Sequence, residues 1–458
     1  MTSGQLRVAV VGSGPAGVYA AHALTAAASE TRAVTVDVID RLPTPYGLVR
    51  YGVAPDHLKI KSITRNLHAM LDLPSVRFLG NVAYGADVDL AELRARYHAV
   101  VFATGSPHDR RLGVPGEDLP GSTTAVDVVA WYSGHPDATV PPLHAREVAV
   151  VGAGNVALDV ARVLAKGAAG LAHTDMPEHV HTAFGTAAVS DVHIVIRRGP
   201  AQVRFTPLEL REMGALAGVD VVVDPDDLVL DAASEQAVNE HRATRTMVEL
   251  LREWSQRPGT HAPRRVHFHF FRRPTAILGN ETVSGLQLER CAPDGTGGVR
   301  GTGATEVVPA QLVVRAIGYR GAPISGLPFD EATATVPNDE GRVGGALSGC
   351  YVAGWIKRGP TGVIGTNKAD AAQTVRTILA DLDAGRLPPP TETSDLLDLL
   401  DERGVAYALW DGWLRIDAHE VELGTSSGRE RTKVGDLETM VRLSRARSSS
   451  GGSGPRPR

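Results

Sequence analysis

Two strand–glycine-turn–helix segments, one at the N-terminus and one near the middle of the chain, predict an α/β fold with two dinucleotide-binding, Rossmann-like domains. Each segment begins with an apolar stretch, LRVAVV in the first and REVAVV in the second, and continues into an alanine-rich helix. The first turn has the spacing G-x-G-x-x-G, and the second has alanine in the last place. The positions are Gly12, Gly14 and Gly17, and then Gly152, Gly154 and Ala157.

The first turn is expected to hold a pyrophosphate. Gly12 lets the chain turn tightly, Gly14 lets the pyrophosphate approach the backbone, and Gly17 lets the helix pack closely on the sheet. The phosphates then lie at the positive N-terminus of the helix. The next apolar strand, VTVDVID, ends at Asp40, whose carboxylate can accept hydrogen bonds from ribose hydroxyls. These features, in this order, suit the adenosine half of FAD.

The second turn is followed by a strand with a different ending. Within the stretch DVHIVIRRGP, the predicted strand ends at Arg197 and Arg198 rather than at an acid. A ribose that carries a 2′-phosphate is repelled by a carboxylate, whereas guanidinium groups bind phosphate with fork geometry. The arginine pair therefore favours NADP over NAD at this site, although a solvated pair at a strand end is the plain alternative.

Two further strands indicate where the chain passes between the domains. YHAVVFATGSP ends at the small residues Ala103 to Gly105, and QLVVRAIGYRG covers residues 311–321. The NADP-binding domain is therefore expected as an insertion into a discontinuous FAD-binding domain. The expected divisions are residues 1–108 for the first part of the FAD domain, 109–321 for the NADP domain, 322–440 for the second part with a helical C-terminal subdomain, and 441–458 for a disordered tail.

Composition excludes several classes of protein. The only cysteines, Cys291 and Cys350, exclude an iron–sulfur cluster held by four thiolates and a C-x-x-C redox pair. They also argue against a disulfide framework, so a cytoplasmic location is expected. A net charge of −5 gives no general reason to expect nucleic acid as a partner. No apolar run approaches the roughly 18 residues needed to span a bilayer, so no membrane insertion is expected.

Three longer motifs carry a family resemblance. They are TPYGLVRYGVAPDH, RRGP followed by FTPLELREM, and GWIKRGPTGVIGTNKADA. With the two glycine turns, they are similar to the adrenodoxin reductase-like family of ferredoxin–NADP reductases, in particular its mycobacterial members, up to about residue 440. The resemblance implies an FAD flavoprotein that exchanges two electrons with NADP(H) and single electrons with a separate, acidic ferredoxin. We expect a monomer.

The resemblance also implies which residues lie along the two nucleotides. Glu209 is assigned on this basis alone, because PLELRE otherwise looks like an ordinary helix face, and Tyr84 replaces a residue that is smaller in the family. From its neighbours alone, Trp355 could either stack near the cofactor or fill a core. Expected along FAD are Ala16, Asp40, Leu48, Tyr84, Trp355, Gly362, Val363 and Ile364. Expected along NADP(H) are Arg110, Ala153, Gly154, Asn155, Val156, Arg197, Arg198, Glu209 and, near the nicotinamide, Gly362.

His57 and Asp159 are expected to cooperate near the flavin. His57 begins a helix whose apolar positions keep helical spacing, and Asp159 lies early in the second fingerprint helix, where the helix dipole favours its charge. The family pattern brings these two helix starts together across the domain junction. The alternative is a structural contact that only orients the domains. The apolar positions are Ile60, Ile63, Leu67 and Met70.

Arg211, Arg242 and Arg245 are candidates for a basic patch that docks the ferredoxin, by analogy with the family. Scattered, solvated arginines are the alternative. Two other functions stay open: an NADPH-dependent flavin monooxygenase or oxidase, and an NADP-binding redox sensor without turnover. The long second nucleotide domain with its arginine pair fits the monooxygenase less well.

Overall fold

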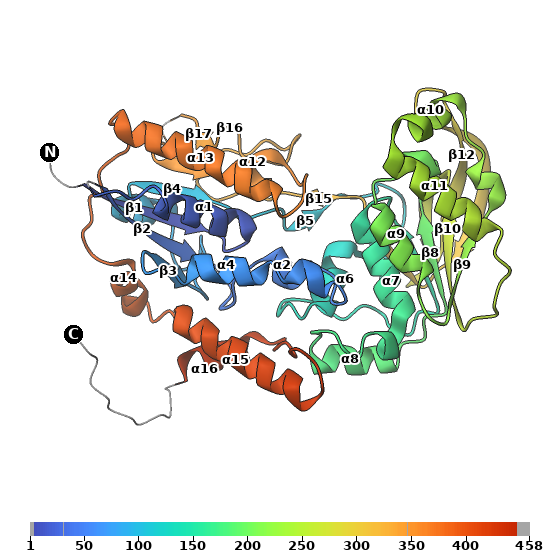
Figure 1. The fold of residues 1–458 in the computed structure, drawn as a ribbon, viewed down its shortest axis with the longest axis horizontal. Coiled ribbons are helices and arrows are strands. Elements are labelled where there is room, and N and C mark those ends of the chain that lie inside the picture. Colours follow the sequence, from blue (N-terminus) through green and yellow to red (C-terminus); the bar gives the residue numbers. More distant parts are fainter. Residues whose placement is uncertain (1–3, 31, 346, 447–458) are drawn as a thin grey trace.

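The chain forms two lobes, each built on a sheet of mainly parallel strands (Figure 1). The computed structural model describes residues 4–30, 32–345 and 347–446. The first lobe takes its sheet from two separated stretches of chain, and the second lobe is inserted between them. This arrangement confirms the predicted fold class of two Rossmann-like units, one of them discontinuous.

The sheet of the first lobe has the order β16-β17-β18-β4-β1-β2-β3. Its four N-terminal strands and β18 are parallel, and β16 and β17 form an antiparallel edge. The strands are β1 (Gly4–Val11), β2 (Arg32–Ile39), β3 (Val76–Leu79), β4 (Ala99–Phe102), β16 (Asn338–Asp339), β17 (Arg342–Val343) and β18 (Cys350–Val352).

The second lobe has a parallel sheet of order β6-β14-β7-β8-β10-β9, covered on one side by a three-stranded antiparallel sheet. The strands of the parallel sheet are β6 (Ser122–Thr124), β7 (Glu147–Val151), β8 (Asp191–Val195), β9 (Val219–Val223), β10 (Arg264–His269) and β14 (Leu312–Arg315). The antiparallel strands are β11 (Arg272–Gly279), β12 (Val283–Pro293) and β13 (Val299–Pro309). Between the lobes, β5 (His108–Asp109) pairs with β15 (Tyr319–Arg320).

Helices cover the sheets and form the C-terminal subdomain below the first lobe (Figure 1). None of the described helices is long and apolar enough to cross a membrane. The first lobe contains α1 (Pro15–Thr25), α2 (Leu48–Tyr51), α3 (Leu58–Lys61), α4 (Thr64–Leu71), α5 (Leu90–Arg96), α12 (Trp355–Arg358) and α13 (Thr366–Asp383), followed by α14 (Leu396–Glu402), α15 (Trp410–Ser426) and α16 (Leu437–Arg445). The second contains α6 (Ala125–Tyr132), α7 (Asn155–Gly170), α8 (Glu178–Gly185), α9 (Pro207–Gly214), α10 (Ala232–Glu240) and α11 (Arg242–Ser255).

The continuous apolar runs of the sequence become strands that are buried on both faces, as parallel sheets require. In β1, Val8 and Val10 face the core beneath α1 and α13, whereas Ala9 and Val11 face the core beneath α5 and α14. The carboxyl end of β1 therefore leads directly into the first glycine turn from a rigid, fully packed strand.

Two sequence predictions need correction. The expected helix after His57 is divided into α3 and α4, because the hydroxyls of Ser62 and Thr64 donate to the carbonyls of Lys59 and Lys61 and compete with the helical ladder. The predicted disordered tail begins too early, since α16 continues to Arg445 and packs Met440 and Leu443 into the core of the first lobe. Residues 447–458 lie outside the described residues.

A buried lysine of the C-terminal segment joins the two lobes. Lys433 is 3% exposed, and its Nζ donates to the Arg50 carbonyl of the first lobe at 2.7 Å and to the Ser133 carbonyl of the second at 3.2 Å. Asp175 lies 3.2 Å from the same Nζ and also accepts from Lys61 at 2.6 and 2.7 Å. Burial lowers the pKa of Lys433 to about 7, and the charges of Lys61 and Arg50 act in the same direction, against that of Asp175.

We predict that replacing Lys433 by methionine changes how stability depends on pH. The folded-state pKa of about 7 lies below the ordinary 10.5, so the unfolded chain binds more protons between these pH values. This group's contribution to stability therefore increases as the pH rises from 7 toward 10, with a slope of at most about 1.4 kcal/mol per pH unit. Urea unfolding at pH 7, 8 and 9 should show a steeper increase for the parent than for Lys433→Met. Exposed Lys59→Met is the control, and equal slopes for parent and Lys433→Met would contradict the prediction.

Candidate active site

The first glycine turn is built for close backbone approach. Gly12 has φ +108°, and a Cβ there would lie 2.5 Å from the Ala103 carbonyl oxygen. A Cβ on Gly17 would lie 1.9 Å from the Gly12 carbonyl oxygen, so α1 packs directly on the turn. Gly14 is the N-cap of α1 and offers no side-chain cap, whereas α5 and α10 begin with an Asp side chain that accepts from a first-turn amide. The first amides of α1 are therefore left for another acceptor.

Asp40 is held beside this turn at the carboxyl end of β2. Its Oδ2 accepts from the backbone N of Ser13 at 2.9 Å and from the Ser13 hydroxyl at 2.5 Å, and its Oδ1 accepts from the backbone N of Leu42 at 3.0 Å. The carboxylate is thus fixed in orientation, and its remaining lone pairs suit ribose hydroxyls.

Three other residues expected along FAD lie close to the turn in the fold. Ala16 lies next to Gly354, where an added Cβ would be 2.6 Å from the Ala16 Cβ, and Trp355 follows Gly354 directly. Leu48, 38% exposed, follows Gly47, whose added Cβ would be 3.0 Å from the Cα of Gly14. The half-buried Trp355 ring packs against Tyr319 at a centroid distance of 5.2 Å, at the strand crossing between the lobes.

Tyr84 packs its ring on Phe102 at 5.0 Å and donates its hydroxyl to the Ser325 carbonyl at 2.6 Å. Phe102 immediately precedes Ala103, which touches Gly12, so Tyr84 lies near the same end of the sheet.

The loop before α13 contains the last residues expected along FAD, Gly362, Val363 and Ile364. Gly362 has φ +82°, and Val363 is 75% exposed, an apolar side chain open to a further contact.

The second turn repeats this construction in the second lobe. A Cβ on Gly152 would lie 2.4 Å from the Ala316 carbonyl oxygen, and Gly154, the N-cap of α7, faces open space and has no side-chain cap. Asn155 begins α7, and its side chain accepts from the backbone N of Thr206 at 3.0 Å. Val156 is partly buried and packs on the core.

Two other residues expected along NADP(H) make backbone contacts. The Ala153 carbonyl accepts from the backbone N of Arg204 at 2.7 Å. Arg110 lies at the strand crossing, where its backbone N donates to the Gly318 carbonyl at 3.0 Å.

The arginine pair follows β8 and leaves its charge uncompensated. Arg197 is exposed and Arg198 half-buried, and both line an open pocket of about 320 Å³. Partial burial and the neighbouring charges of Arg204 and Arg197 lower the pKa of Arg198. Within the described part of the chain, no carboxylate lies within ion-pair distance of these three guanidinium groups. Such a cluster suits a phosphate dianion.

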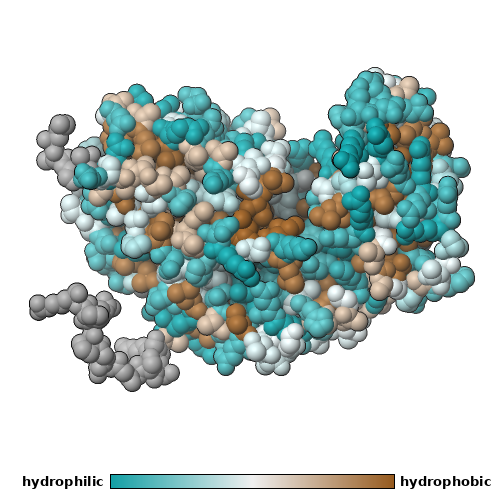
Figure 2. All heavy atoms as spheres, viewed as in Figure 1, coloured by the Kyte–Doolittle hydropathy of each residue, from teal (hydrophilic) through white to brown (hydrophobic). Residues whose placement is uncertain are grey.

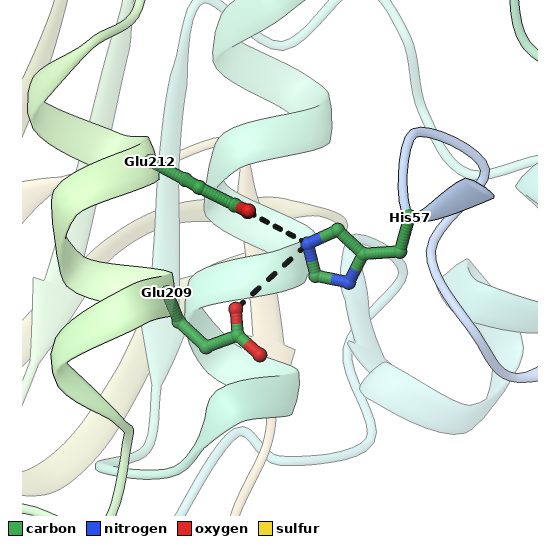
Figure 3. A group of neighbouring side chains, drawn as sticks. All are labelled: His57, Glu209 and Glu212. Carbon is green, nitrogen blue, oxygen red and sulfur yellow. Dashed lines mark hydrogen bonds and ion pairs between the residues drawn. The ribbon is translucent and has the colours of Figure 1, made fainter. Parts of the chain in front are cut away.

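His57 lies at the junction and faces two glutamates of the second lobe (Figure 3). Its Nε2 lies 2.8 Å from the Oε2 of Glu212 and 3.8 Å from the Oε2 of Glu209, both on α9. The expected partner, Asp159, is farther away, with its Oδ1 3.9 Å from Nδ1. The histidine is thus held between α9 and α7, and its shortest contact is with Glu212 rather than Asp159.

A buried arginine connects these acids to the first lobe. Arg162, 1% exposed, donates to both carboxylate oxygens of Asp56 at 2.8 and 2.9 Å and lies 2.7 Å from Asp159. Burial raises the pKa of Asp159, against the charges of Arg162 and His57. Burial, and then the nearby charge of Asp159, raises the pKa of Glu209, whose Oε2 has no hydrogen-bond partner among the described residues.

Three residues of this arrangement were not predicted from the sequence. Glu212 lies three residues after Glu209 on one helix face, and Arg162 lies three after Asp159, so helical spacing could have indicated both. Arg204 lies between the arginine pair and α9, where no local pattern distinguishes it. Glu209 was expected along NADP(H), and the structure places it beside His57.

The residues fit two different nucleotides. Both turns combine a close backbone approach with uncapped helix amides, which suits a pyrophosphate. The first has a fixed carboxylate for a ribose, as FAD would use, and the second has unpaired guanidinium groups for a 2′-phosphate, as NADP(H) would use.

Comparisons with known proteins agree with this geometry. The family model described as pyridine nucleotide-disulphide oxidoreductase matches residues 6–363. The chain is 44% identical over 448 residues to the NADPH-ferredoxin reductase FprA of Mycobacterium leprae, covering 95% of this chain and 98% of that protein. It is 38% identical over 464 residues to the mitochondrial NADPH:adrenodoxin oxidoreductase of Arabidopsis thaliana, covering 96% and 95%.

A solved structure of Mycobacterium tuberculosis FprA in complex with NADPH superposes with a TM-score of 0.91 at 43% identity, covering 96% of this chain and 100% of that one. The match includes both lobes, so it extends from the glycine turns to the junction between them. The chain therefore belongs to the pyridine nucleotide-disulphide oxidoreductases and, among them, to the family of FprA-type NADPH-ferredoxin reductases.

Proposed function

We propose that this protein is an FAD-dependent ferredoxin–NADP(+) reductase that moves electrons between NADPH and a separate ferredoxin. The observation that carries the proposal is the contrast between the two nucleotide turns of one chain. Asp40 is fixed beside the first, and the unpaired Arg197 and Arg198 follow the strand beside the second. When bound, FAD would accept a hydride from NADPH and release single electrons to an iron–sulfur protein.

A disulfide is not the proposed substrate. Cys291 lies in β12 of the second lobe and Cys350 in β18 of the first, and both are free and buried. Burial raises the pKa of both thiols, which disfavours the reactive thiolate. Free thiols fit a reducing compartment, and we propose the cytoplasm.

His57 is proposed to manage charge next to the flavin. The Oε2 of Glu212 lies 2.8 Å from the Nε2 of His57 and can accept a hydrogen bond from it. Asp159 lies on the other side of the ring, near Nδ1. A hydride moves without needing a general acid, but negative charge then accumulates on the acceptor, and a protonated histidine would stabilise it. The contact between His57 and Glu212 thus makes the charge next to the flavin depend on the position of α9.

The ferredoxin is proposed to dock where α9 and α11 meet the hollow between the lobes. Arg211 on α9 and Arg242 and Arg245 on α11 are exposed, and the two helices pack together. Arg245 also donates to the carbonyls of Val238 and Asn239 at the end of α10. Figure 2 shows apolar side chains gathered beside the hollow, which would add apolar contact to the charged rim.

Replacing both Arg197 and Arg198 by alanine should weaken NADPH binding and leave NADH binding almost unchanged. Each charge-assisted contact to a 2′-phosphate contributes about 1.5–3 kcal/mol, so a loss of at least about tenfold is expected. Titration of the flavoprotein with each nucleotide measures this, with exposed Arg252→Ala on α11 as the control. Equal losses for both nucleotides would show that the pair has a structural role.

His57→Gln should slow reduction of the flavin by NADPH, with little change in NADP affinity. Glu212→Gln and Asp159→Asn should act in the same direction, and the effects of His57 and Glu212 should not add, because they remove one contact. Stopped-flow reduction rates test this. Rates equal to the parent in all three variants would reduce the cluster to a structural contact between the lobes.

Turnover with ferredoxin should fall as salt concentration rises, while ferricyanide reduction should not, because only the protein partner is attracted electrostatically. The triple variant of Arg211, Arg242 and Arg245 to alanine should reduce the salt dependence with ferredoxin. Arg376→Ala, which removes an exposed arginine of α13 in the first lobe, should leave it unchanged. The same salt response for both acceptors would exclude this docking surface.

A further inference from the structure

A segment of the second lobe brings another arginine to the phosphate-binding region. The backbone N of Arg204 donates to the Ala153 carbonyl at 2.7 Å, and the backbone N of Thr206 donates to the Asn155 side chain at 3.0 Å. Residues 204 to 206 are therefore attached at two points to the second glycine turn and the start of α7. The Cα of Arg204 cannot move away from that turn without breaking the first of these bonds.

The Arg204 side chain is exposed and lies close enough to Arg198 for the two charges to repel. The three guanidinium groups have no carboxylate partner within the described ranges. Nearby acids are already engaged: Glu289 pairs with Arg273, and Asp294 accepts from the amides of Thr296 and Gly298. The like charges of Arg204 and the arginine pair repel one another, and an anion among them would relieve this repulsion.

We propose that Arg204 is the third guanidinium of the 2′-phosphate site and contributes to the preference for NADPH over NADH. The inference depends on the proposed function, because it assumes that Arg197 and Arg198 bind the 2′-phosphate. Arg204 would approach that phosphate from the side of the glycine turn, and the arginine pair would approach it from the end of β8. The phosphate would then be bound from two sides, and the repulsion between the guanidinium groups would be relieved.

The proposal is tested by calorimetric titration of the FAD-loaded protein with four probes: NADP⁺, NAD⁺, adenosine 2′-monophosphate and adenosine 5′-monophosphate. Arg204→Ala should weaken binding of the two probes that carry a 2′-phosphate by roughly tenfold, since one exposed charge-assisted contact is lost. The other two probes should bind as they do to the parent. Arg204→Lys, which keeps the charge but not the fork, should lie between. Arg252→Ala is the matched control for removal of an exposed arginine.

Higher salt should reduce the difference between Arg204→Ala and the parent, because the contact is exposed and screened. An equal loss for NADP⁺ and NAD⁺ would overturn the proposal and assign Arg204 to the shared pyrophosphate. No loss for any probe would also overturn it and leave Arg204 a solvated side chain. If the double variant Arg197→Ala/Arg198→Ala shows no selective loss for the two probes that carry a 2′-phosphate, the proposed NADP site itself is wrong. If the double variant shows that selective loss and Arg204→Ala does not, the site stands without a third arginine.

Discussion

The buried ion pairs between the two lobes are the constraint on which the candidate active site depends. Arg162 of α7 is 1% exposed and binds Asp56 of the first lobe through two hydrogen bonds, and Lys433 and Lys61 bind Asp175. Charges removed from water in this way gain little net stability, but removing one partner costs about 3–5 kcal/mol. Their effect is therefore to specify one relative position of the lobes. His57 directly follows Asp56, so the pair that holds the lobes together also holds His57 against Glu212.

The two nucleotide sites share a backbone design and differ in charge. In each, a glycine permits a close approach between the turn and a neighbouring strand, and a helix begins without a side-chain cap. In the proposed function, the side chains at the end of the next strand would discriminate between the nucleotides. At the first turn the Asp40 carboxylate is fixed by Ser13. At the second, exposed Arg197 and half-buried Arg198 have no ion-pair partner among the described residues. One fold thus provides two sites with opposite electrostatic preference.

Much of this could be predicted because it is encoded locally. The strand, turn and helix of the first fingerprint extend from Gly4 to Thr25, and those of the second extend from Glu147 to Gly170, so each fingerprint is one continuous stretch of chain. Arg197 and Arg198 follow β8 after a single residue, Ile196, so their place near a strand end was visible in the sequence. The split of the helix after His57 was missed because hydroxyl-to-carbonyl bonds compete with the ladder.

The sequence by itself determined the fold class, the two glycine turns and the residue types that end the strands beside them, because each depends on neighbours along the chain. Only the tertiary structure decided the partners across the junction. Glu212 lies 155 positions from His57, and Lys433 lies hundreds of positions from Arg50, yet each pair is in direct contact. Sequence patterns place a side chain on a face of its own helix or strand. The packing of the two lobes determines which distant group meets that face. Burial then strengthens the hydrogen bond or ion pair between them, because the dielectric constant in the interior is low.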